Sequence, residues 1–252
     1  MFADADLTHD AFLGGKLHLW QPRKGYRAGT DPVLLAAACP ANPGQAVLDL
    51  GCGAATATLC LAARVPNLRL AGLELQPEYA DLARRNAYAN GIDMLIETGS
   101  LTEMPQSLRT GFDHVIANPP YYARAGSPSP LAGRDAALRV SVPLAAWVEA
   151  ASRRLNPGGC FTLICGADGL PEVLAALGSR LGSTVVLPLV PRANRPALRI
   201  ILRARKGGRS PFRLLSPLIM HDGDAHNGDR QSYSPQTSAI LRDGAGLSAE
   251  FG

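Results

Sequence analysis

The sequence has few of the features that mark secreted, membrane or metal-binding proteins. Its five cysteines contain no CxxC pair and lie inside apolar runs, which indicates reduced, buried thiols rather than disulfides or zinc ligands. No uninterrupted apolar stretch reaches the length of a membrane span, and the first twelve residues carry acids where a signal peptide would carry bases. The five histidines are scattered, so we expect solvated loop histidines and no metal site. We therefore expect a cytoplasmic protein without a metal.

Acidic residues are missing from one long part of the chain. The formal net charge is only +4, yet no acid occurs between residues 192 and 213. The bases there are Arg192, Arg195, Arg199, Arg203, Arg205, Lys206, Arg209 and Arg213. This basic stretch (residues 192–213) would suit a phosphate backbone, and the alternative is a solvated strand with basic ends.

Seven short apolar runs predict seven strands. Helical patterns separate several of the first five, and repeated strand-helix-strand units mean parallel pairing with right-handed crossovers. Only residues 191–196 separate the last two runs, which is too short for a crossover helix, so these two strands must be antiparallel. The predicted strands are 46–50, 69–75, 94–98, 112–117, 160–165, 184–190 and 197–204. The sequence therefore predicts an α/β fold: a seven-stranded, mostly parallel sheet with a terminal antiparallel hairpin and helices on both faces.

A glycine-containing loop follows the first predicted strand, in "VLDLGCGAAT". Gly51 and Gly53 leave the backbone bare, so a ligand can approach main-chain N–H groups at the carboxyl edge of the sheet. Glu74 ends the second strand, where an acid can hold both ribose hydroxyls of a nucleoside; a charge at a helix start is the alternative. A nicotinamide-dependent oxidoreductase is disfavoured because Thr56 stands where the dinucleotide fingerprint has its third glycine.

The tetrapeptide Asn118-Pro119-Pro120-Tyr121 follows the fourth predicted strand. The two prolines fix two φ values, remove two N–H donors and bias Asn118 to an extended shape, so only acceptors face a substrate. An amine conjugated to a ring or a carbonyl is a poor nucleophile because its lone pair is delocalised. The Asn118 side-chain oxygen and the Pro119 carbonyl would hold both N–H bonds and align that lone pair, while Tyr121 offers a flat face. A plain proline turn with a buried tyrosine is the alternative.

The "DLGCG" loop, the second-strand acid and "RLNPGGCFTLI" resemble the Rossmann-like class I S-adenosylmethionine-dependent methyltransferases. The resemblance implies that Asp49 organises the methionine end of the cofactor, that Gly51 and Gly53 line it, and that Glu74 holds the ribose. It also implies an adenine contact after the third strand, where Ser100 stands in place of the family's acid.

Three longer stretches narrow the resemblance. The "LGGKLHLWQPRKGYRAGTDPVLLAAA" segment (residues 13–38), "NPPYY" and the late "LIMHDG...YSPQTSAILR" resemble the bacterial tRNA adenine-N6 methyltransferases that modify an anticodon-loop adenine of a valine tRNA. In related amino-methyltransferases the first segment closes over the cofactor, which implies that Gly29, Thr30 and Asp31 line it. From the residues alone, Thr30 or Asp31 caps a helix that begins at Pro32.

The expected organisation has three parts. Residues 1–45 form an N-terminal extension that closes over the cofactor, residues 46–221 form the methyltransferase domain, and residues 222–252 form a polar, loosely held tail with one short helix after Ser234 and Pro235. The expected activity is methyl transfer from S-adenosylmethionine to the N6 amine of an adenine in structured RNA, held partly by residues 192–213. The alternatives are an N-methyltransferase of a protein glutamine or a small molecule, and a catalytically silent RNA-binding protein.

Overall fold

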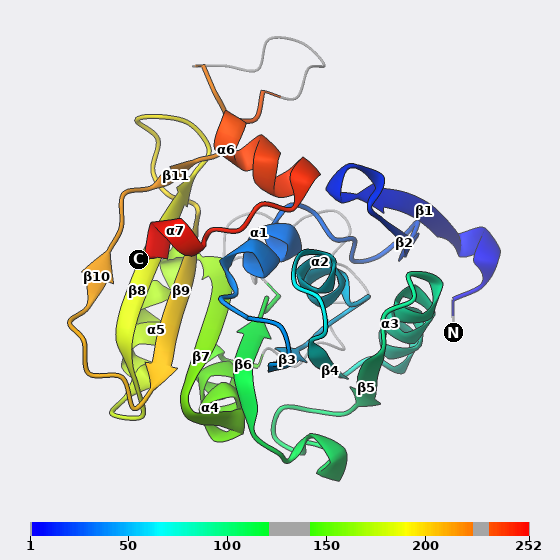
Figure 1. The fold of residues 1–252 in the computed structure, drawn as a ribbon, viewed down its shortest axis with the longest axis horizontal. Helices are drawn as coiled ribbons and strands as arrows, with labels where there is room; N and C mark the ends of the chain where they lie inside the picture. The colour runs from blue at the N-terminus through cyan, green and yellow to red at the C-terminus, as the bar shows by residue number, and fades with distance from the viewer. Residues whose placement is uncertain (1, 121–141, 224–231, 252) are drawn as a thin grey trace.

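One twisted sheet organises the chain (Figure 1). The computed structural model describes residues 2–120, 142–223 and 232–251. The nine-stranded sheet has the order β10-β8-β9-β7-β6-β3-β4-β5, with β11 beside β8. Its strands are β3 (Ala46–Leu50), β4 (Arg69–Glu74), β5 (Met94–Thr98), β6 (Phe112–Ala117), β7 (Leu155–Gly166), β8 (Leu181–Val190), β9 (Arg199–Lys206), β10 (Arg213–Leu214) and β11 (Leu218–Ile219).

All seven predicted strands are present, as β3 to β9. Strands β8 and β9 form the predicted antiparallel pair, and β9 lies between β7 and β8, antiparallel to both. The count of seven was too low, because β10 and β11 extend the sheet by pairing in parallel with β8. Each of these strands is two residues long, which is too short for a period-2 pattern to be read from the sequence.

Helices cover both faces of the sheet (Figure 1). On one face lie α1 (Asp31–Ala38), α2 (Thr56–Arg64) and α3 (Pro77–Ala89), and α1 and α2 bury their apolar residues in one core. On the other face α4 (Leu144–Arg154) and α5 (Leu170–Leu177) close a second core. Helix α5 was not predicted. The five cysteines are buried and free, as predicted.

An N-terminal hairpin, which the sequence did not reveal, packs along α3. Strands β1 (Leu7–Phe12) and β2 (Leu17–Pro22) pair with each other in an antiparallel sheet of two. The other edge of β2 is satisfied by α3, because Asn86 and Asn90 each exchange two hydrogen bonds with the backbone of β2 at Trp20 and His18. Asparagine amides thus replace a third strand, and they tie the start of the chain to the side of the main sheet that α3 covers.

The second half of the C-terminal segment is packed, which corrects the expectation of a loosely held tail. The predicted short helix is present as α6 (Pro235–Ser238), and the Ser234 hydroxyl accepts a hydrogen bond from the Thr237 N–H as its N-cap. A π-helical turn (Ala239–Asp243) follows and then α7 (Ser248–Phe251). Ile240 and Phe251 are buried, and the Phe251 ring lies 3.8 Å from the Arg203 guanidinium carbon. Polar composition concealed this packing.

His114 is another correction, because it is buried in β6 rather than solvated in a loop. Its Nε2 lies 2.8 Å from the Gln45 side-chain oxygen, and burial lowers the pKa of His114 to about 4. Within the described part of the chain, no helix combines the length and apolar character needed to cross a membrane.

Candidate active site

The register of the parallel strands brings three predicted site residues together. Leu50 at the end of β3 pairs with Leu73 of β4 on one side and with Ala117 of β6 on the other. The next residue on each strand is therefore at the same level of the carboxyl edge, and neighbouring strands lie about 4.8 Å apart. These next residues are Gly51, Glu74 and Asn118.

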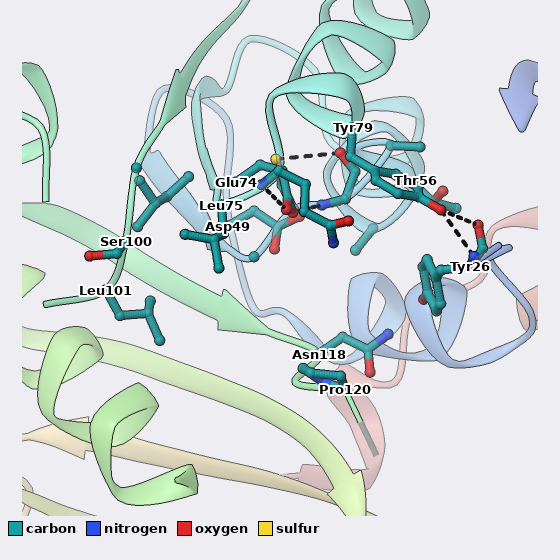
Figure 2. A pocket seen from close by; sticks show the side chains of 18 of the residues that line it. Tyr26, Asp49, Thr56, Glu74, Leu75, Tyr79, Ser100, Leu101, Asn118 and Pro120 are labelled. Carbon is teal, nitrogen blue, oxygen red and sulfur yellow. Dashed lines mark hydrogen bonds between the residues drawn. The ribbon is translucent and has the colours of Figure 1, made fainter. Parts of the chain in front are cut away.

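A cavity of about 430 Å³ opens at this edge (Figure 2), a size typical of small-molecule sites. Six of the predicted site residues line it: Asp49, Gly51, Gly53, Glu74, Ser100 and Asn118. Pro119 is buried beside it, and Pro120 contributes to the wall. Tyr121 lies outside the described residues.

Gly51 is required by both its conformation and its surroundings. Its φ of 65° lies in the left-handed region, and a Cβ built there would lie 2.6 Å from the Trp147 ring. Trp147 is buried on α4 and also lines the cavity. The bare backbone of the loop therefore lets α4 approach the end of β3.

Asp49 is a carboxylate that the fold holds away from water. Its side chain is 2% exposed, and the Thr58 hydroxyl donates a 2.6 Å hydrogen bond to Oδ2. Burial, helped by the nearby Glu74 carboxylate, raises the pKa of Asp49 to about 7, although the hydrogen bond from Thr58 acts in the opposite direction. A cation in the cavity would favour the ionised form of Asp49.

Glu74 accepts two backbone hydrogen bonds. Its Oε2 accepts from the Gly53 N–H at 2.8 Å and its Oε1 from the Gln76 N–H at 2.9 Å, so both carboxylate oxygens are fixed (Figure 2). Burial raises the pKa of Glu74, and the backbone hydrogen bonds oppose that rise. Each oxygen keeps a second lone pair, so the group can still accept from a pair of hydroxyls.

The far end of the cavity is apolar and uncharged. Leu75 and Leu101 lie there near Ser100 in the view of Figure 2. The Ser100 Oγ accepts from the Glu103 N–H at 2.9 Å, which leaves it a small polar group at the rim. A flat heterocycle suits this end better than a charged group does, because two leucine side chains offer it apolar contact.

Tyr26 reaches the opposite end of the cavity from the N-terminal segment. The Tyr79 hydroxyl of α3 accepts from the Tyr26 N–H at 3.0 Å and donates to the Tyr26 carbonyl at 3.2 Å. Figure 2 shows the Tyr26 ring directed toward the amide of Asn118. Burial raises the pKa of Tyr26 to about 12, as do the carboxylates of Asp31 and Asp49, whereas a hydrogen bond with the Asn118 side chain lowers it. The Tyr26 phenol is therefore neutral where its ring faces the Asn118 amide.

The side-chain oxygen of Asn118 is buried, and it accepts no hydrogen bond from the described residues. A buried acceptor without a donor costs about 1–3 kcal/mol of free energy. An N–H group brought by a ligand would remove that cost.

Gly29, Thr30 and Asp31 do not share the walls of this cavity. Thr30 and Asp31 line a second cavity of about 130 Å³, and Asp31 Oδ2 accepts a 2.6 Å ion-pair hydrogen bond from Arg199 Nε. Gly29 is exposed and lines neither of the two cavities. The expectation was that Thr30 or Asp31 caps α1. Thr30 does stand at the N-cap, but its side chain makes no capping hydrogen bond, and the Asp31 carboxylate pairs with Arg199.

The comparisons with known proteins agree with this geometry. The sequence profile described as "methyltransferase small domain" matches residues 28–177. The chain belongs to this methyltransferase family. The tRNA1(Val) (adenine(37)-N6)-methyltransferase of Dickeya chrysanthemi is 28% identical over 229 residues, covering 88% of each chain. The resemblance inferred from the motifs is therefore confirmed.

Solved structures confirm the class I methyltransferase fold. A predicted O-methyltransferase from Agrobacterium tumefaciens superposes with a TM-score of 0.69 at 26% identity, covering 86% of this chain and 98% of its own. The 16S rRNA N2 G1207 methyltransferase of T. thermophilus, solved with AdoMet and guanosine, gives a TM-score of 0.56 at 20% identity, covering 79% of this chain and 50% of its own.

Several residues of this methyltransferase site were not identified from the sequence. Tyr79, Leu101 and Trp147 belong to none of the motifs read from the sequence, and Tyr26 occurs only within the segment of residues 13–38. Each comes from a different element, so only the folded arrangement brings them together. Among the described residues, no group of three or more metal-ligating side chains forms a metal site.

Asp49→Asn is expected to raise the stability of the protein near neutral pH while weakening its binding of the cofactor. The folded-state pKa of about 7 lies above the ordinary 3.8, so the proton is bound more tightly in the folded state and stability falls as the pH rises from about 4 to 7. In urea denaturation at pH 8, the free energy of unfolding of the variant should therefore exceed that of the wild type by on the order of 3 kcal/mol. This difference should shrink toward pH 4. It should also bind S-adenosylmethionine more weakly, as calorimetry would measure.

Asp113→Asn is the control. Asp113 accepts from the Ala46 N–H, and this hydrogen bond lowers its pKa, so its stability contribution is present above the unfolded pKa and disappears in acid. The control should lower stability at pH 8 and leave cofactor affinity unchanged. If Asp49→Asn also lowers stability at pH 8, the desolvated state assigned to Asp49 is wrong.

Gly51→Ala tests the close approach of Trp147. Gly51 and Gly91 have φ values of 65° and 64°, so alanine at either site carries the same left-handed strain of about 1–2 kcal/mol. Only at Gly51 would the new methyl meet another side chain, since nothing lies within 4 Å of the corresponding position at Gly91. Thermal unfolding should show a larger loss for Gly51→Ala, and only this variant should lose cofactor binding. Equal effects of the two substitutions would contradict the assignment.

Proposed function

We propose that the protein transfers the methyl group of S-adenosylmethionine to the exocyclic N6 amine of an adenine in structured RNA, a tRNA above all. The observation that carries the proposal is the position of Asn118, with its unpartnered side-chain oxygen, beside a cavity lined by Asp49 and Glu74. The printed activity of the 28% identical relative supports the same substrate class. A tRNA substrate would also agree with the expected cytoplasmic location.

The charges of the cavity fit a cationic cofactor. S-adenosylmethionine supplies an electrophilic methyl group on a positively charged sulfur. Asp49 and Glu74 are two desolvated carboxylates in one cavity, and a positive charge placed there would stabilise the ionised form of each. Asp49 is placed to face the methionine end, Gly51 and Gly53 to offer backbone contacts, and Glu74 to hold the ribose. Ser100, between Leu75 and Leu101, is placed for the adenine end.

The Asn118-Pro119-Pro120 corner acts on the nucleophile. The adenine amine is held by two acceptors, the Asn118 Oδ1 and the Pro119 carbonyl, so its lone pair turns out of conjugation and toward the methyl group. A nitrogen–carbon bond forms as the sulfur–carbon bond breaks, and the cationic amine then loses a proton to water. No strong base is needed, because the methylated cation is a strong acid.

The target base must leave its stack to reach Asn118. Tyr121 is kept in the proposal as the aromatic surface on which the base lies, although it falls outside the described residues. Tyr26 is the described aromatic ring at this end of the cavity. The Tyr26 ring faces the Asn118 amide, and the unpartnered side-chain oxygen of Asn118 would accept from the amine of the base.

The three-part organisation also remains a proposal. The N-terminal extension (residues 1–45) closes over the cofactor through Tyr26, which Tyr79 fixes at the cavity wall. Gly29, Thr30 and Asp31 would lie beside the methionine end once the cofactor binds, with Asp31 keeping its ion pair with Arg199. Residues 46–221 carry the chemistry.

Asn118→Ala tests the proposal directly. The variant should lose about 10²–10³-fold in methylation rate, because one aligned acceptor is removed, while its affinity for S-adenosylmethionine stays within threefold of the wild type. The measurement is mass spectrometry of nucleosides from unmodified tRNA incubated with purified protein, together with calorimetry of the cofactor. Asn42→Ala, at an exposed position away from the cavity, is the matched control and should retain full activity.

Two results would overturn this function. Transfer to a glutamine-containing peptide and none to RNA would replace the substrate, and full activity of Asn118→Ala would remove the mechanism. Salt dependence gives an independent check, because an RNA substrate should bind more weakly as salt rises, whereas an uncharged small molecule should bind equally well.

A further inference from the structure

Strand β9 divides the basic stretch (residues 192–213) between two opposite edges of the sheet. Arg199 begins β9 and pairs with Gly166 at the carboxyl end of β7, whereas Arg205 pairs with Cys160, six residues back along β7. Six residues of strand span about 20 Å. The loop before β9 therefore lies at the carboxyl edge, at the top of the view in Figure 1, and Arg205 and Arg209 lie toward the opposite edge.

Two of the basic side chains are buried and make hydrogen bonds inside the protein. Arg192 is 8% exposed and donates to the backbone carbonyls of Asp222 and Gly223 and to the Ser232 hydroxyl. Arg203 is 9% exposed and donates to the Ala38 carbonyl. Neither guanidinium can neutralise the phosphate of a substrate. The stretch is therefore not one continuous nucleic-acid surface, and only its carboxyl-edge end faces the same way as the candidate active site.

The second cavity lies at that end. Its walls come from the start of α1, the end of β8, the start of β9 and the segment around Met220 and His221. The His221 and Tyr233 rings stack with centroids 4.8 Å apart and planes 21° apart, and both residues line the cavity. Arg192 supports the segment that carries His221 by donating hydrogen bonds to the backbone carbonyls of Asp222 and Gly223.

Arg199 supplies the charge of the second cavity. Its Nε donates to Asp31, which fixes the guanidinium in the wall, yet 44% of its side chain remains exposed. Arg195 is exposed in the loop above. A planar guanidinium fixed by a carboxylate but open to solvent is suited to bind a phosphate, and the apolar and aromatic side chains beside it are suited to a base.

The two cavities share one wall. Thr30 and Asp31 line the second cavity and Pro32, the next residue, lines the first. Along the sheet, β7 separates β6, which ends at Asn118, from β9, which begins at Arg199. The second cavity is therefore on the side away from β3 and β4, where Asp49 and Glu74 lie, and next to the corner that would receive the target base.

We propose that the second cavity binds a nucleotide that flanks the target adenosine in the same RNA. Arg199, with Arg195, contacts the phosphate, and the flanking base lies against the His221–Tyr233 stack and the apolar side chain of Leu198. This inference rests on the proposed function. Under this inference only the carboxyl-edge end of the basic stretch contacts RNA, rather than the whole stretch. The second cavity then helps to determine which RNA is accepted.

The test compares two double variants with the same change in charge. Arg195→Gln/Arg199→Gln removes two bases at the carboxyl edge, and Arg205→Gln/Arg209→Gln removes two at the other edge. Binding of an unmodified valine tRNA transcript is measured by filter binding between 50 and 300 mM salt (about the range in which phosphate contacts dominate). The first pair should weaken binding about tenfold or more at the lowest salt and lower the salt slope by about 1 per arginine, whereas the second should change affinity less than twofold.

Two single variants separate direct from indirect effects. Arg199→Lys keeps a cation for Asp31 and should retain more RNA affinity than Arg199→Gln. Tyr233→Leu keeps apolar volume but removes the stacking ring, and it should weaken RNA binding by about tenfold without changing the salt slope. Calorimetry of S-adenosylmethionine should give wild-type affinity for all variants.

The outcomes are distinguishable. Equal RNA affinities for the two double variants would overturn this inference, and so would a loss of RNA affinity that always accompanies a loss of cofactor affinity. If the wild-type protein still methylates tRNA, the proposed function stands in either case. A wild-type protein that methylates no RNA would overturn both. A selective loss in the Arg195/Arg199 and Tyr233 variants, with cofactor binding retained, supports the flanking-nucleotide site.

Discussion

The hydrogen-bond register between β3 and its two neighbours is the constraint on which the site depends. Because Leu50 pairs with Leu73 and Ala117, the chain leaves three adjacent strands at one level, at Gly51, Glu74 and Asn118. A shift of one residue would move each side chain to the other face of the sheet. The cores on both faces oppose such a shift, since β3 and β6 are almost entirely buried. Packing energy thus fixes the distance between Glu74 and the Asn118-Pro119-Pro120 corner.

Several groups in the cavity lower the stability of the free protein, and the rest of the fold offsets this loss. Asp49 and Glu74 are buried together, burial raises the pKa of each, and Asn118 Oδ1 accepts no hydrogen bond from the described residues. Each of these groups is complementary to something a methyltransferase would bind: a cationic cofactor, a pair of ribose hydroxyls and an N–H donor. The same groups that lower stability in the free protein are therefore those that a ligand would satisfy.

The sequence predicted the parallel core well because apolar runs, a glycine loop and an X-Pro-Pro corner are local signals. It failed where structure depends on distant partners. The N-terminal hairpin is completed by Asn86 and Asn90 of α3, and the polar C-terminal segment packs through Ile240 and Phe251; neither arrangement has a local pattern. The basic stretch was read as one feature because charge is counted along the chain, whereas β9 carries its two ends to opposite edges of the sheet.

The most direct test of the central claim is a crystal structure of the protein with S-adenosylhomocysteine and adenosine. The account predicts the thioether sulfur beside Gly51, the ribose hydroxyls on Glu74, and the adenine N6 about 2.7–3.2 Å from both the Asn118 side-chain oxygen and the Pro119 carbonyl. An adenosine amine bound away from Asn118, or a homocysteine moiety outside the cavity of Asp49 and Glu74, would contradict it.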